Sequence, residues 1–103
     1  MLGTHKTTAH VNDNRELIVC YHSTEVVKVI NDRYVVLKSG GWLTPTTKRR
    51  MNQASEQYQL NYLVYQRGFV WYVKTPICLT EFYDGIVIDI ESGAISKELI
   101  NKI

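Results

Sequence analysis

The 103-residue sequence is short of the residues that mark specialised classes of protein. It has two cysteines and three histidines, and none of them stand at the close pair spacings that zinc sites use. No apolar run is long enough to cross a bilayer, and the polar first residues do not resemble a signal peptide. The sequence therefore predicts no metal, no cofactor and no membrane partner.

Catalytic constellations are also lacking. His22 precedes Ser23, but neighbouring residues of a strand point to opposite faces, so the two do not form a base and a nucleophile. Asp84 and Asp89 are five residues apart across a predicted turn, where Asp84-Gly85 is ordinary turn chemistry. We therefore expect a protein that is not an enzyme.

The composition is that of one globular domain, with 45% hydrophobic and 21% charged residues and a net charge of +2. The charges are unevenly distributed. Residues 38–50 hold four cations and no acid, whereas residues 81–102 hold five acids and two lysines. This asymmetry predicts an oriented electrostatic surface. Cys20 and Cys78 lie in apolar runs, which is typical of reduced core cysteines in a reducing compartment.

Alternating and β-branched runs predict an α+β fold built from antiparallel hairpins. Asn31-Asp32-Arg33 is the turn of one hairpin, and Gln66-Arg67-Gly68 is the turn of the second. We expect the hairpins to merge into one curved sheet, with a central helix packed on it and a short C-terminal helix over residues 97–102. The expected strands cover residues 16–22, 26–30, 34–38, 58–65, 69–74 and 86–90, with a short extended piece at 77–80. Residues 1–14 are polar and predict a mobile tail, which leaves residues 15–103 as the domain.

The central helix is predicted from Pro45 to about residue 57. Thr44 is suited to the N-cap, and Pro45 fits the first helical position because its missing N–H costs nothing there. One narrow stripe recurs at helical spacing and is expected to face the sheet: Thr47, Met51, Ala54 and Tyr58.

Lys48, Arg49 and Arg50 stand near the start of this helix, where the helix dipole disfavours cations. They are either a solvated face or part of an anion-binding site that also uses the hydroxyls of Thr46 and Thr47. The glycines and Lys48 do not have P-loop spacing.

Two further residues belong to this candidate surface, Lys38 and Trp42. Trp42 either packs the helix against the sheet or lies exposed beside Gly40 and Gly41, and we favour the packed position. Tyr62, Trp71 and Tyr72 are expected to fill the core or cover the sheet, although exposed aromatics beside a basic helix could stack nucleic-acid bases.

Four runs of the sequence resemble a family of small proteins of tailed bacteriophages. The likeness spans about residues 17–90. The runs are His22-Ser23-Thr24-x-Val26-Val27, Ser39-Gly40-Gly41-Trp42-x-Thr44-x-Thr46-Thr47-Lys48-x-Arg50-Met51-Asn52, Val64-Tyr65-Gln66-x-x-x-Val70-Trp71-Tyr72-Val73 and Phe82-Tyr83-Asp84-Gly85. The resemblance implies a phage-encoded protein of the infected host's cytoplasm and supplies no catalytic residues.

Three functions fit a small phage protein of this kind. The first is nucleic-acid binding through the basic helix start, with phosphate contacts from the three cations. The second is host takeover or counter-defence, in which an aromatic-rich patch binds and inhibits a host protein. The third is a minor virion component. Edge strands also allow pairing into a homodimer.

Overall fold

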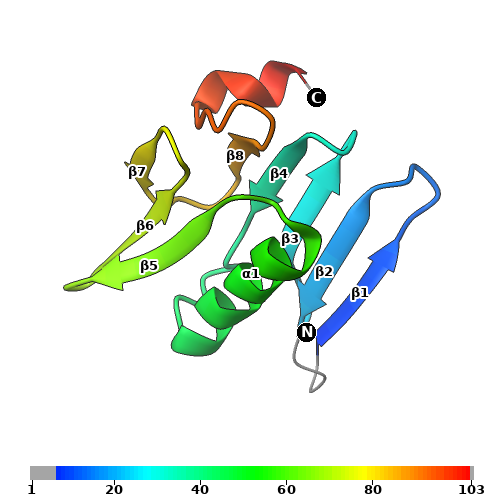
Figure 1. Ribbon diagram of the computed structural model, residues 1–103. Coiled ribbons are helices and arrows are strands. Elements are labelled where there is room, and N and C mark those ends of the chain that lie inside the picture. Colours follow the sequence, from blue (N-terminus) through cyan, green and yellow to red (C-terminus); the bar gives the residue numbers. More distant parts are fainter. Residues whose placement is uncertain (1–6, 103) are drawn as a thin grey trace.

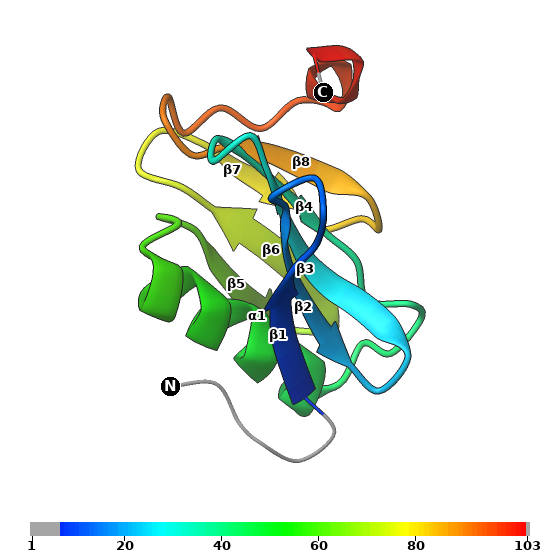
Figure 2. The same ribbon diagram turned by 90° about the vertical axis from the view of Figure 1, so that its right-hand side faces the viewer.

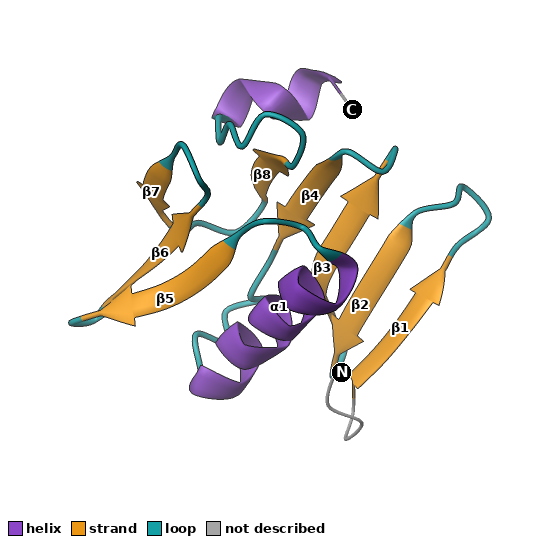
Figure 3. Cartoon of the chain, viewed as in Figure 1, coloured by secondary structure: helices purple, strands orange, loops and turns teal. Residues whose placement is uncertain are grey.

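The computed structural model describes residues 7–102, except for the side chains of Ile100 and Lys102. Eight strands form two antiparallel sheets, accompanied in this part of the chain by one α-helix and a short 3-10 helix (Figures 1 and 3). The predicted α+β class is confirmed.

The larger sheet has five strands in the order β1-β2-β3-β4-β8. Four of them follow one another along the chain, and β8 joins from the C-terminal part by pairing with β4. The predicted hairpin across Asn31-Asp32-Arg33 is present as β3 and β4. The bounds are β1 Thr7–Val11, β2 Leu17–Tyr21, β3 Thr24–Ile30, β4 Tyr34–Leu37 and β8 Ile86–Asp89.

The smaller sheet consists of β5 (Leu63–Arg67), β6 (Val70–Lys74) and β7 (Leu79–Glu81). The hairpin predicted around Gly68 is its β5–β6 pair. The two predicted hairpins do not merge into one sheet as expected. The reason is that β4 is paired on both sides, with β3 and with β8, so it has no free edge for β5.

Strand β1 lies inside the segment predicted to be a mobile tail, and for residues 7–11 that prediction is wrong. Its five residues pair with β2, from Thr7 opposite Tyr21 to Val11 opposite Leu17. Thr7 is buried, but the other four side chains are exposed. An edge strand is held by backbone hydrogen bonds, so it needs no apolar pattern that sequence analysis could detect. The remainder of the predicted tail before residue 7 lies outside the described residues.

Helix α1 (Pro45–Tyr58) starts where predicted. The Thr44 side chain accepts a hydrogen bond from the Thr47 amide, and Pro45 occupies the first turn. The helix ends one residue later than expected, at Tyr58, and Gln59 caps it in the left-handed conformation. Because Gln59 and Asn61 both have positive φ, the strand predicted from residue 58 can begin only at Leu63.

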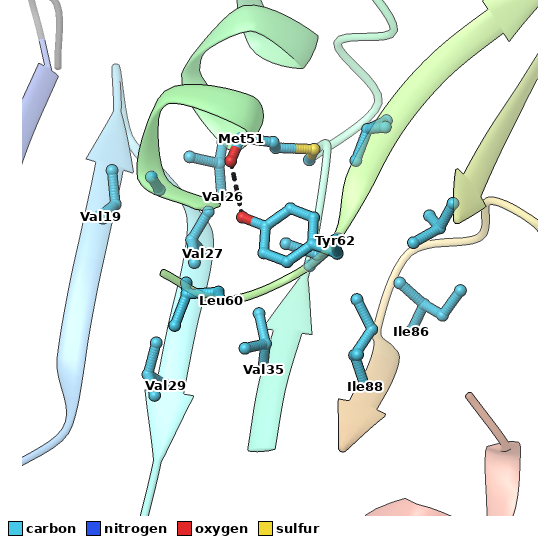
Figure 4. Close-up of a cluster of buried hydrophobic side chains, with 14 of the residues drawn as sticks. Val19, Val26, Val27, Val29, Val35, Met51, Leu60, Tyr62, Ile86 and Ile88 are labelled. Atoms are coloured by element: carbon cyan, nitrogen blue, oxygen red, sulfur yellow. Dashed lines mark hydrogen bonds between the residues drawn. The ribbon is translucent and has the colours of Figure 1, made fainter. Parts of the chain in front are cut away.

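The main core lies between α1 and the two sheets (Figure 4). Met51 and Ala54 of the predicted stripe are fully buried, Thr47 is buried with them, and Tyr58 is half-buried. Tyr62 and Trp71 are core residues as expected. Tyr72 instead lies half-buried on the other face of its sheet, stacked on Tyr65 with ring centroids 5.6 Å apart.

Two polar side chains of α1 join the helix to the chain that follows it. Asn52 donates to the carbonyl of Val64 at 2.7 Å and accepts from the Val64 amide at 2.8 Å. Ser55 donates to the Tyr62 carbonyl at 2.6 Å and accepts from the Tyr62 amide at 3.1 Å. The Asn52 pair gives β5 the backbone partners that a neighbouring strand would otherwise supply, and the Ser55 pair does the same for Tyr62 just before the strand. Together they set the position of the smaller sheet relative to the helix.

The C-terminal helix is present over the predicted residues as the 3-10 segment η1 (Lys97–Lys102). It packs through Leu99 against Tyr34, Val36 and Val87, on the face of the larger sheet opposite α1. Figure 2 shows η1 well away from α1, with the sheets between them. No helix among residues 7–102 has the length and apolar character that crossing a membrane requires.

The end of β8 is fastened by a buried carboxylate. Asp89 accepts three hydrogen bonds from Arg33, with the shortest at 2.9 Å, and one each from the amides of Glu91 and Ser92. The Arg33 guanidinium, helped by these amides, lowers the pKa of Asp89 to about 2.

Because of Asp89, the free energy of unfolding should depend on pH in the acid range. The pKa of Asp89 is lower in the folded protein than in the unfolded chain, where it is near 4. Its contribution to stability is therefore complete above about pH 4 and is lost as pH falls towards 2. We expect Asp89→Asn to reduce the free energy of unfolding at neutral pH by about 1.5 kcal/mol, discounted because Arg33 is half exposed. Urea unfolding from neutral pH to pH 2 should show this difference closing below about pH 4. A difference that stays constant over that range would contradict the assignment.

Candidate functional site

The turn that leads into α1 is held by one carboxylate. Asp84 accepts from the Ser39 amide at 2.9 Å, from the Ser39 hydroxyl at 2.7 Å and from the Gly40 amide at 3.0 Å. Gly40 and Gly41 both have positive φ, which an L-residue rarely adopts. The two glycines and Asp84 therefore build the turn that positions the helix start.

The start of α1 has few donors left for an anion. Pro45 has no N–H, the Thr47 amide is bonded to the Thr44 hydroxyl at 3.2 Å, and the Lys48 amide is bonded to the Thr44 carbonyl at 3.2 Å. Thr47 is fully buried, and its hydroxyl is bonded to that of Thr44 at 3.1 Å. The predicted role of Thr47 as a ligand donor is not supported by this geometry, whereas Thr46 is only half-buried.

The three cations are spread around the helix. Lys48 extends towards the smaller sheet, with its Nζ 3.4 Å from Gln66 Oε1 and 5.7 Å from the Trp71 ring centre. Arg50 extends to the larger sheet, donating to Thr7 Oγ1 at 3.0 Å and lying 5.7 Å from the Tyr21 ring centre. Arg49 is exposed between them. We call these three residues the cationic belt, because they cross the helix from one sheet to the other.

The cationic belt is not neutralised by acidic residues. Among the ion pairs of residues 7–102, none joins Lys48, Arg49 or Arg50 to a carboxylate. Three acids of the C-terminal part are engaged elsewhere, Asp89 and Glu91 with Arg33 and Asp84 with the turn before α1. Within this part of the chain, the belt therefore has no carboxylate partner.

A groove of about 550 Å³ opens beside the start of α1. Aromatic side chains from two segments line it, namely Tyr21, His22 and Trp42. Hydroxyl side chains line the remainder, namely Ser23, Thr24, Thr44 and Thr46. We call this the aromatic groove.

Trp42 does not pack the helix against the sheet, so the favoured interpretation of this residue is wrong. Its side chain is 62% exposed. Met51 and Ala54 already fill the space beneath the helix, and the turn of Gly40 and Gly41 carries Trp42 outwards. Lys38 is likewise exposed, while its amide donates to the Val26 carbonyl at 3.2 Å.

A comparison with known protein families identifies the family of this chain. The family model described as Kyanoviridae Gp96 protein matches residues 2–89. The chain belongs to this phage protein family. No curated protein and no solved structure shows a significant similarity to it.

The residues that carried the resemblance to phage proteins have identifiable places in this Kyanoviridae Gp96 family member. Gly40 and Asp84 build the turn before α1, and Asn52 joins α1 to β5. These are structural contacts. From the same runs, Trp42 is exposed, and Lys48 and Arg50 are half-buried at the surface.

Sequence analysis missed the contribution of Tyr21, His22 and Ser23 to a site in this family member. The sequence predicts a strand and its connection at these positions, and nothing in their residue types indicates a groove. The signal available was the run His22-Ser23-Thr24, which stands far from the helix in sequence and meets it only through the sheet. Both cysteines are free and half-buried, so neither is the fully buried core residue expected.

Proposed function

We propose that this member of the Kyanoviridae Gp96 family is a non-enzymatic protein that binds nucleic acid through the cationic belt. The observation that carries the proposal is that Lys48, Arg49 and Arg50 present three positive charges with no carboxylate against them. Surface cations that have no carboxylate partner are what a phosphate backbone neutralises on binding. The proposal places the protein in the cytoplasm of the infected host, in contact with nucleic acid.

The geometry favours an extended backbone over a single anion. Lys48 and Arg50 point to opposite sides of α1, so they cannot close on one phosphate. Successive phosphates of a strand that crosses the helix could contact the three cations in turn. Arg49 is the most sensitive probe, because it is exposed and its removal disturbs no packing.

Binding should be tested with labelled single- and double-stranded DNA at low and physiological salt. We expect tight binding at low salt that weakens steeply as salt rises, through counterion release. Arg49→Glu should weaken binding about tenfold, and alanine at all three belt positions should abolish binding at physiological salt without unfolding the domain. Arg15→Glu makes the same charge change at an exposed turn residue and should have little effect.

A triple alanine variant that binds as well as the wild type would overturn this proposal. So would equal losses in Arg49→Glu and Arg15→Glu, since that result reports only net charge. Thermal unfolding of each variant separates lost binding from lost folding.

A host protein is the second candidate partner, and a different surface favours it. Phe69 in the β5–β6 turn is fully exposed, and it lines a groove of about 340 Å³ with Leu43, Val70 and Phe82. Exposed aromatic and aliphatic groups of this kind anchor protein interfaces. Absence of DNA binding at low salt, together with capture of a host protein that Phe69→Ala abolishes, would favour this candidate.

A further inference from the structure

We propose that the aromatic groove holds an unpaired base of single-stranded nucleic acid, while the cationic belt holds the neighbouring phosphates. This inference rests on the nucleic-acid function proposed above and specifies the form of nucleic acid that is bound. It assigns a separate role to a groove that does not include the belt residues.

The lining of the groove matches a base better than a phosphate. Its walls are Tyr21, His22 and Trp42, and its polar groups are the hydroxyl side chains of four Ser and Thr residues. Among residues 7–102, no Asp, Glu, Lys or Arg lines it. Every base has a flat face that stacks on aromatic rings and an edge that hydroxyls can bond, whereas aromatic walls offer nothing to the charge of a phosphate.

Trp42 is the residue best placed to stack. It is 62% exposed, so a base can cover its ring without displacing core side chains. The other two rings of the groove, Tyr21 and His22, contact each other edge-on with centroids 4.3 Å apart. The turn fixed by Asp84 holds the backbone before Trp42, so little ordering is needed when a base enters.

The groove is continuous with the cationic belt. Tyr21 forms a wall of the groove and also underlies the Arg50 guanidinium, 5.7 Å from its ring centre. A strand that runs along the belt therefore brings a base to the groove beside Arg50. In a duplex that base is stacked and paired, so the groove selects single strands.

The test uses three probes of equal length: labelled oligothymidine, the same oligonucleotide with central abasic sites, and the corresponding duplex. Trp42→Ala should weaken binding of the intact single strand about tenfold. It should leave the abasic strand and the duplex unaffected, because their phosphates still reach the belt. Leu79→Ala removes a comparably exposed large apolar side chain, 57% against 62% for Trp42, outside the groove and should change none of the three.

Tryptophan fluorescence gives an independent readout. Stacking should quench Trp42, whereas Trp71 is 6% exposed in the core and should not respond. The quench on adding oligothymidine should therefore vanish in Trp42→Phe. This variant keeps an aromatic ring and should still bind.

The outcomes separate this inference from the proposed function. If Arg49→Glu weakens binding but Trp42→Ala binds the intact strand like the wild type, base binding in the groove is contradicted and phosphate binding by the belt is supported. If the wild type bound intact and abasic strands with equal affinity, base binding in the groove would likewise be contradicted. If the wild type binds no probe at low salt, both proposals fail.

Discussion

Replacing Tyr62 with alanine should lower the free energy of unfolding by about 4 kcal/mol, a large part of the stability of a domain this size. Tyr62 is buried where the chain passes from α1 to β5, within the main core (Figure 4). Truncation removes the ring and leaves a cavity between the helix and both sheets. Burial raises the pKa of the Tyr62 phenol well above its usual range, so the phenol stays neutral as a donor. Urea unfolding at neutral pH measures the loss.

Tyr62→Phe is the matched control. It keeps the ring and removes only the hydroxyl, which donates to the Met51 carbonyl at 2.6 Å. We expect a loss of about 1 kcal/mol, the usual net contribution of one hydrogen bond. Comparable losses in the two variants would mean that the hydrogen bond, and not ring packing, holds this part of the core. A small loss in both would contradict the assigned position of Tyr62.

Local patterns in the sequence predicted most elements of the fold, because residues close together in the chain determine where most of these elements begin and end. The Thr44 cap and Pro45 mark the start of α1, and Gly68 marks the turn between β5 and β6. Pairing between distant segments has no such signal. The addition of β8 to β4, which separates the two sheets, depends on contacts about fifty residues apart in the chain. The edge strand β1 was missed because backbone pairing leaves no pattern of side chains.

The candidate site was predicted in part. The position of Lys48, Arg49 and Arg50 on the first turns of a helix follows from the sequence, but their spread to opposite sheets does not. Helical periodicity places them 100° apart, and only the sheets on either side decide where Lys48 and Arg50 rest. The aromatic groove could not be predicted, because its walls come from two segments joined by tertiary contacts.

Gly40→Ala should cost about 3 kcal/mol, because two separate effects combine at this position. The residue has φ of +64°, a conformation in which a Cβ is strained. The added Cβ would also lie 2.5 Å from Thr24 Oγ1 and 2.9 Å from Thr24 Cγ2. Thr24 is β-branched and sits at the start of β3, so it cannot move away freely. Thermal or urea unfolding of the purified variant measures the cost.

Gly41→Ala distinguishes the two effects. Gly41 has φ of +86°, yet an added Cβ meets nothing within 4 Å, so only the backbone strain of about 1 kcal/mol is expected. Adding Thr24→Ala to Gly40→Ala should recover most of the difference between the two glycine variants, because it removes the clashing atoms. Equal losses at Gly40 and Gly41 would show that Thr24 does not pack against this turn. Since Thr24 also lines the aromatic groove, that result would contradict both the geometry of the turn and the lining of the groove.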